Sequence, residues 1–125
     1  MKNNDQKYQS SYDEFMERYK ANPVGAREVG ESINDFTQFF VDYNFVLGQA
    51  RIAFDKKYAE IIKSADGETG KPMSAAKAEV LVKASKEGED FTEAESHVKN
   101  IDKILSALAY LQKGIAIEQG NVSRI

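Results

Sequence analysis

Two stretches with a seven-residue apolar period flank a short segment rich in glycine and proline, and this pattern restricts the chain to few folds. The stretches cover residues 29–62 and 75–117. Apolar residues that alternate by three and four positions are typical of a coiled-coil seam, because they fall on one side of an α-helix. The period predicts an all-α fold, an antiparallel coiled-coil hairpin of two long helices. Four series carry it: Ile33, Phe40, Leu47, Phe54 and Ile61; Val29, Phe36, Tyr43 and Ala50; Ala84, Phe91, Val98 and Leu105; and Val80, Ala94, Ile101, Leu108 and Ile115.

The ends of the predicted helices follow from capping residues and breaks. Asn22 and Pro23 suit the start of the first long helix, and Ser74 suits the cap of the second, in which Gly88 interrupts the period. Residues 1–10 are polar, so we expect them to be frayed. The predicted elements of this single domain, residues 1–125, are a short N-terminal helix over 11–21, long helices over about 24–63 and 74–118, and a tip turn over 64–73.

The apolar stripes are wider than one partner helix can cover. Four residues widen them beyond the seam: Phe39, Val46, Ile104 and Leu111. Exposed apolar strips of this length indicate an interface. We therefore predict a homo-oligomer of hairpins with these four residues in its interface.

Composition excludes several classes of protein. The 125 residues include no cysteine, so disulfides and thiolate sites are absent, and the net charge of -3 gives no overall attraction to nucleic acid or an anionic membrane. No stretch approaches the roughly 18 apolar residues of a membrane span. These features predict a cytoplasmic protein that has no membrane contact.

Motifs that could carry chemistry fail on their spacing. The run Gly67 to Lys71 resembles the end of a phosphate-binding loop, but Ala65 and Pro72 stand where that loop needs a glycine and a magnesium-binding hydroxyl. A calcium loop starting at Asp66 fails likewise, because lysines occupy its glycine and closing-acid positions. His97, the only histidine, has no second metal-ligating residue one helical turn later in the sequence. We therefore expect no enzyme activity, no catalytic residue, no cofactor and no metal.

Charge is distributed unevenly along the chain. Residues 51–86 hold eight basic and five acidic side chains, an excess of three positive charges, whereas the remainder has an excess of six negative charges. In a hairpin these basic residues gather towards the tip, where phosphates could bind. Tyr58 lies among these basic residues and could stack on a base. Phe45, another aromatic residue of the first long helix, falls off the apolar stripe. The predicted nucleic-acid-binding residues are Arg51, Lys56, Lys57, Lys63 and Lys71.

Residues 50–117 resemble the UvsY-like family of phage recombination mediators. The resemblance lies in Lys56-Lys57-Tyr58, Ser64-Ala65-Asp66-Gly67, Ser74-Ala75-Ala76-Lys77 with Val80-Leu81, and the run Ile101 to Gly114 with Leu105, Ala107-Leu108 and Lys113-Gly114. It implies a small helical protein that assembles into rings, binds single-stranded DNA and loads a RecA-like recombinase in place of single-strand-binding protein. It also implies DNA contacts at Lys56 and Lys57, close to Lys63, although Ala59 stands where the family has an arginine.

These observations favour a non-enzymatic accessory protein of recombination or replication that binds single-stranded DNA as an oligomer. Its partners would be further copies of itself, single-stranded DNA, and a RecA-like recombinase or single-strand-binding protein. The alternative is a coiled-coil interaction module, such as a phage assembly chaperone, scaffold or inhibitor of a host protein, that binds no nucleic acid.

Overall fold

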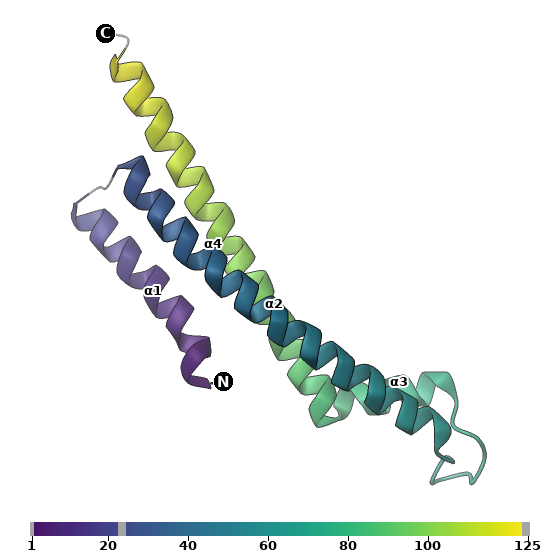
Figure 1. Cartoon of the computed structure of the whole chain (residues 1–125). Helices are drawn as coiled ribbons and strands as arrows, with labels where there is room; N and C mark the ends of the chain where they lie inside the picture. The colour runs from purple at the N-terminus through teal and green to yellow at the C-terminus, as the bar shows by residue number, and fades with distance from the viewer. Residues whose placement is uncertain (1, 23–24, 124–125) are drawn as a thin grey trace. The chain divides into compact units, whose positions relative to one another are not determined.

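The computed structural model describes residues 2–22 and 25–123, and over these the chain is all-α (Figure 1). Its helices are α1 (Lys2–Ala21), α2 (Ala26–Lys63), α3 (Ala75–Ala84) and α4 (Lys86–Ser123). The long helices α2 and α4 pack antiparallel, with the shorter α1 and α3 beside them, so the predicted hairpin is confirmed at this level.

The chain forms two compact units, and both long helices contribute to each. One unit comprises Met1–Asp42 and Lys99–Ile125, and the other comprises Tyr43–Val98. The first unit therefore contains α1 with parts of α2 and α4, and the second contains α3, the tip and the remaining parts of α2 and α4. The prediction of a single domain over residues 1–125 stays a prediction.

Helix α1 begins at Lys2, so the prediction of a short helix over 11–21 after a frayed segment is wrong at its start. Tyr8 explains the extra length. Its ring is 3 % exposed, packs edge-on against Phe39 of α2 at 6.5 Å between centroids, and its hydroxyl accepts a hydrogen bond from Asn100 Nδ2 of α4 at 3.5 Å. Phe15, two turns further along α1, is buried equally well. These two buried rings pack α1 against the rest of the first unit over two helical turns.

Helix α2 ends at Lys63, as the sequence predicts, and its first residue is Ala26. The predicted start around Asn22, Pro23 and Val24 differs, and the last two of these lie outside the described residues. Gly25 N–H donates to the Glu28 carboxylate at 2.7 Å, which is half of a capping box, and Gly25 O accepts the first helical hydrogen bond.

The core follows one of the two predicted series on each long helix. Residues of α2 and α4 with at most 7 % exposure include Val29, Phe36, Tyr43, Ala94, Ile101 and Leu108. The other α2 series, which begins at Ile33, is only half-buried along its whole length. Within the second unit, Phe54 stacks on Phe91 at 5.2 Å, and Tyr43 contacts His97 at 5.5 Å between ring centroids. The coiled-coil character of the hairpin stays a prediction.

The predicted second long helix is wrong as one element, because Ser85 divides it into α3 and α4. Ser85 has extended backbone angles, φ -75° and ψ 168°. Its N–H and hydroxyl donate to Val82 O at 3.2 and 2.5 Å, and its hydroxyl oxygen accepts from Gly88 N–H at 3.2 Å. Ser85 thus ends α3 and caps α4, whose first turn carries Glu87 and Glu89 at the positive end of the helix dipole.

The break also changes which side of α3 is buried. The seven-residue series predicts Val80 and Ala84 on the seam, but Val80 is 67 % exposed and Ala84 is exposed too. Ala78 and Val82, one turn apart, are fully buried instead. A register read continuously through Ser85 therefore assigns the wrong face to α3.

The turn at the tip runs from the end of α2 to Ser74. Ala65 and Pro72 form an isolated antiparallel bridge, and Gly70 has a φ of +69°, a backbone conformation that favours glycine. Ser74 caps α3 by accepting a hydrogen bond from Lys77 N–H at 3.2 Å, which confirms the predicted cap.

Candidate nucleic-acid interface

Three of the eight basic side chains between residues 51 and 86 are paired with acidic neighbours. Lys57 Nζ lies 3.7 Å from Glu60, and Lys83 Nζ lies 4.0 Å from Glu79. Lys77 is held in the tip, as described below. Among the residues that the structure describes, no ion pair involves the remaining five, which are Arg51, Lys56, Lys63, Lys71 and Lys86.

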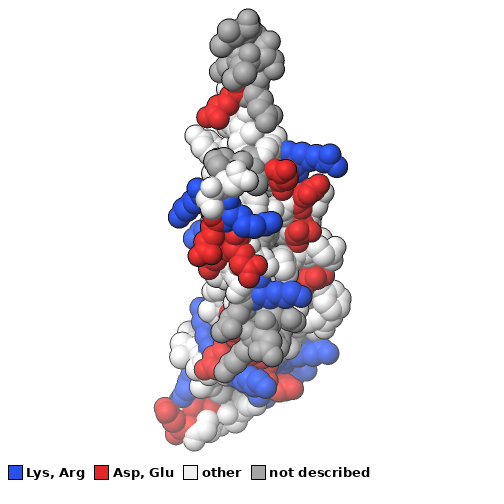
Figure 2. Space-filling view, turned by 90° about the vertical axis from the view of Figure 1, so that its left-hand side faces the viewer, with Lys and Arg blue, Asp and Glu red and all other residues white. Residues whose placement is uncertain are grey.

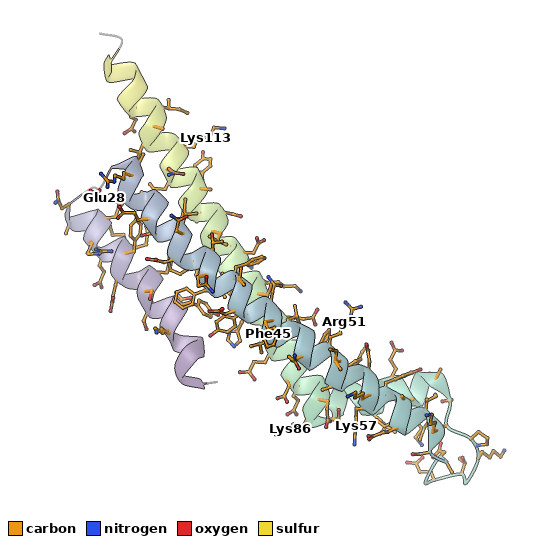
Figure 3. All side chains as sticks on the ribbon, viewed as in Figure 1. Glu28, Phe45, Arg51, Lys57, Lys86 and Lys113 are labelled. Carbon is orange, nitrogen blue, oxygen red and sulfur yellow. The ribbon has the colours of Figure 1, made fainter. Side chains whose placement is uncertain are left out.

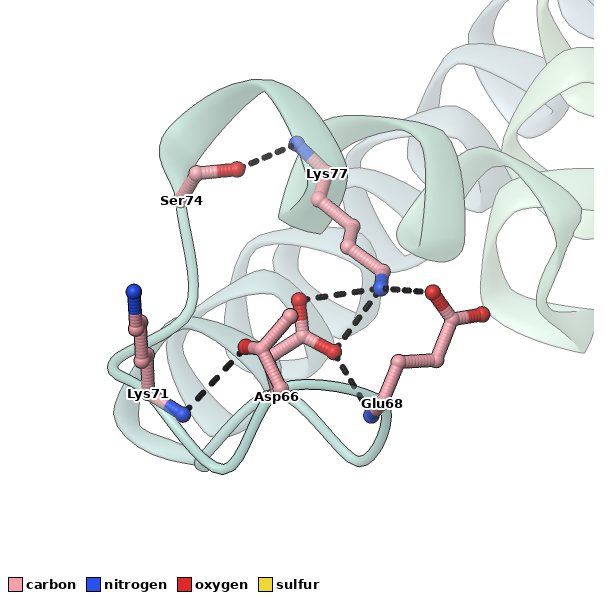
Figure 4. A network of polar contacts seen from close by, with 6 residues as sticks. Asp66, Glu68, Lys71, Ser74 and Lys77 are labelled. Carbon is pink, nitrogen blue, oxygen red and sulfur yellow. Dashed lines mark hydrogen bonds and ion pairs between the residues drawn. The ribbon is translucent and has the colours of Figure 1, made fainter.

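Asp66 lies at the centre of the tip and is 9 % exposed (Figure 4). Its carboxylate accepts hydrogen bonds from Lys77 Nζ at 2.8 and 2.9 Å and from Glu68 N–H at 2.9 Å. Its backbone N–H donates to Lys71 O, and its backbone oxygen accepts from Gly70 N–H, both at 2.7 Å. One side chain thus connects the turn to the first turn of α3.

The same contacts shift the pKa values of the two charged groups. Hydrogen bonding from Lys77 is the main reason why the pKa of the Asp66 carboxyl is lowered, with help from Glu68 N–H. The Lys77 pKa is raised chiefly because its ammonium donates to Asp66, with Glu68 Oε2 as a further acceptor at 3.2 Å. Lys77 is therefore occupied inside the protein, and its charge is not available to a phosphate.

The five predicted site residues do not converge on one face. Figure 3 shows Arg51 and Lys57 projecting from different sides of α2. Lys57 is half-buried and Lys71 is exposed in the tip turn. On the surface drawn in Figure 2, basic and acidic side chains are interspersed. Fewer cations therefore share one exposed face than the count of positive charges in this segment suggests.

Two of the five do share an exposed face of α2. Lys56 and Lys63 are seven residues apart, almost two helical turns, so their side chains leave the helix in nearly the same direction. Their separation along the axis is about 10 Å at 1.5 Å rise per residue. Glu60, which lies between them in sequence, is paired with Lys57.

Sequence reasoning missed that this face continues towards the start of the second unit as an apolar surface. Phe45 is 68 % exposed and Ile52 is 54 % exposed. This face of α2 carries four residues at intervals of seven, four and seven positions: Phe45, Ile52, Lys56 and Lys63. The first and the last are 18 residues, or five full turns, apart, so they lie on the same side of the helix. We call this set the outer face of α2. Phe45 lies off the seven-residue series, and that was the signal that could have located the outer face.

A groove of about 480 Å³ lies in the second unit between α2 and α3. Phe54, Tyr58 and Val82 line it, and the carboxylates of Asp55 and Glu79 lie at the same groove. Two acidic groups disfavour a phosphate there. Tyr58 is half-buried in this groove, so the predicted stacking role of its ring has less support than its sequence position suggests.

The four residues predicted for an oligomer interface differ in exposure. Phe39 is half-buried between Tyr8 and Phe36, and Ile104 is 7 % exposed, so both pack inside the chain. Val46 and Leu111 are half-buried and keep surface that a second copy could cover. The longer α1 accounts for part of the difference, since Tyr8 covers the ring of Phe39.

Comparison of the chain with models of known families, with characterised proteins and with solved structures finds no match. Among the described helices, none combines the length and the hydropathy that a membrane span requires. Within residues 2–22 and 25–123, no group of three or more histidine and acidic side chains is arranged to hold a metal ion.

Proposed function

We propose that this protein is a non-enzymatic accessory factor of DNA recombination or replication that binds single-stranded DNA as an oligomer. The observation that carries the proposal is the pair Lys56 and Lys63, two exposed cations on one face of α2 that have no acidic partner among the described residues. Each ammonium that contacts a phosphate releases a condensed counterion, which favours binding. Repetition of the pair in every subunit would hold a strand for a RecA-like recombinase or a single-strand-binding protein.

The resemblance to UvsY-like mediators supports the same function, because it implies DNA contacts just before the tip turn. Lys56 lies in that stretch and Lys63 follows it closely. Lys71, exposed in the tip, is the next cation along the chain that has no ion pair within the described residues. Arg51 and Lys57 contribute less in this proposal, because Arg51 points elsewhere and Lys57 is paired with Glu60.

The test is fluorescence anisotropy of a labelled single-stranded oligonucleotide, titrated with the full chain at several salt concentrations. We expect wild-type affinity to fall as salt rises. The double variant Lys56→Glu, Lys63→Glu should bind more weakly, and the slope of log affinity against log salt should shrink by about 1.4 for two lost phosphate contacts. Absence of wild-type binding at low salt, or binding that is independent of salt, would contradict the proposal.

A matched control separates local contacts from total charge. Lys103 and Lys113 are exposed on α4, so the variant Lys103→Glu, Lys113→Glu changes the net charge by the same amount on a different helix. We expect it to keep most of the wild-type affinity. Equal losses in both double variants would mean that net charge, and not the outer face of α2, determines binding.

A second candidate is a protein-interaction module, and the exposed side of α3 favours it. Val80 is 67 % and Leu81 is 41 % exposed, which places two adjacent large apolar side chains on the surface. A partner protein could cover them without any nucleic acid. Two results together would favour this candidate. The wild-type protein would fail to bind single-stranded DNA at low salt, and its activity with a partner would fall in the variant Val80→Ser, Leu81→Ser.

A further inference from the structure

Phe45 contributes little to the core of the second unit although it sits in the middle of a long helix. Its side chain is 68 % exposed, whereas Phe54 on the same helix stacks on Phe91. Burial of a phenylalanine normally stabilises a protein, and Phe45 shares its exposed face with a second exposed apolar residue, Ile52, so the two form a surface that a ligand could cover.

The surroundings of Phe45 leave its ring open to a flat ligand. Gly48 lies one turn further along α2, next to Phe45 on the helix surface. A Cβ built at Gly48 meets no atom within 4 Å, so this neighbouring position is empty space. The missing side chain leaves room beside the phenylalanine ring.

The charge along the outer face determines which ligand suits it. Ile52 continues the apolar surface from Phe45, and Lys56 and Lys63 follow without an acidic partner among the described residues. An aromatic ring followed by cations along one direction matches a ligand that has flat apolar groups on an anionic backbone. Proteins that bind single strands without sequence preference combine these two features.

We propose that Phe45 is a stacking site for a nucleobase of single-stranded nucleic acid whose phosphates contact Lys56 and Lys63. This inference rests on the proposed function and adds a base contact to it. Stacking accounts for the exposed ring, and it extends the binding surface along α2 from the tip towards Phe45.

The experiment uses the full chain and an oligothymidylate that carries a single 2-aminopurine, whose fluorescence responds to stacking. Variants are Phe45→Ala, Phe45→Leu and Phe45→Trp, and molar mass is measured by light scattering in the same samples. The alanine and leucine variants should lose roughly fivefold or more in affinity, together with the fluorescence change, because one stacked base is lost. The tryptophan variant should retain both. The salt slope should stay at the wild-type value in all three, since no phosphate contact is removed.

The control is Tyr110→Ala, which removes an aromatic ring that is 82 % exposed on α4, and its binding should match wild type. Any one of three results would overturn this inference and leave the proposed function standing: wild-type binding by Phe45→Ala, full binding by Phe45→Leu, or weaker binding accompanied by a lower molar mass. The last would assign Phe45 to contact with a second copy. Failure of the wild-type chain to bind at low salt would instead overturn the proposed function, and the base contact with it.

Discussion

At the scale of single residues, Gly88 is the position on which the corner between α3 and α4 depends. A Cβ added there would lie 2.5 Å from Lys83 O and closer still to Val82 O, and both are backbone atoms of α3 that cannot move aside cheaply. Gly88→Ala should therefore destabilise the protein by roughly 1 to 3 kcal/mol, as overpacking does elsewhere. Urea unfolding followed by circular dichroism measures this change.

Gly48 provides the matched control for Gly88, because it is also helical but its added Cβ would meet nothing within 4 Å. Gly48→Ala should stabilise the protein by about 0.5 to 1 kcal/mol, since alanine loses less backbone freedom on folding. Equal effects of the two substitutions would show that the close approach at the corner plays no part.

Asp66 and Lys77 make the stability of the tip depend on pH at both extremes. The Asp66 pKa is lowered in the folded protein, so its contribution is present at neutral pH and is lost as pH falls below about 4. The Lys77 pKa is raised, so its contribution is present below about pH 10 and is lost at higher pH. Urea midpoints of wild type and Asp66→Asn should differ at pH 7 and converge in acid. A difference that stays constant down to pH 2 would contradict this assignment.

At the scale of the helices, α1 is attached to the first unit chiefly through buried aromatic rings. Tyr8 is 3 % exposed and contacts both α2 and α4, so Tyr8→Ala should destabilise the protein by about 3 kcal/mol. Tyr110 is 82 % exposed, and Tyr110→Ala should change stability by less than about 0.5 kcal/mol. Unfolding in urea distinguishes the two, and a Tyr8→Ala variant as stable as wild type would mean that α1 is not held by this ring.

The sequence predicts best those helices whose signals are local and repeated. The period of α2, its end at Lys63 and the Ser74 cap could all be read from neighbouring residues. The length of α1 could not be read in this way. Tyr8 is a single aromatic ring among polar residues, and its contribution to the stability of α1 depends on contacts with Phe39 and Asn100. The division at Ser85 was missed because a serine cap and a single glycine weigh little against a long apolar period.

The candidate site was predictable only in part, for a related reason. Counting charges includes Lys56 and Lys63 among the predicted site residues, but it cannot tell which lysines are paired inside the protein, as Lys57 and Lys77 are. Phe45 and Ile52 belong to the same face through helical geometry, yet exposure of an apolar residue follows from packing elsewhere in the chain.

At the scale of the whole molecule, a homo-oligomer stays a prediction, and two valines of α2 test it. Val46 is half-buried and belongs to the predicted interface, whereas Val41 is 56 % exposed and does not. Val46→Ser should lower the molar mass measured by light scattering, and Val41→Ser should leave it unchanged. A wild-type mass equal to one chain, or dissociation by Val41→Ser, would contradict the predicted interface; circular dichroism of each variant verifies that the helices remain folded.

The contact between Tyr8 and Asn100 spans 92 positions in sequence, whereas Asp66 and Lys77 are only 11 apart. Closing so long a loop is slower and costs more conformational entropy than closing the short loop at the tip. During synthesis on the ribosome, the tip can therefore close while the chain is still growing. Helix α1, although it emerges before α2, α3 and α4, must wait until α4 has been made before Tyr8 has all its partners. Among the four described helices, the one translated before the other three is thus the last to reach its final packing.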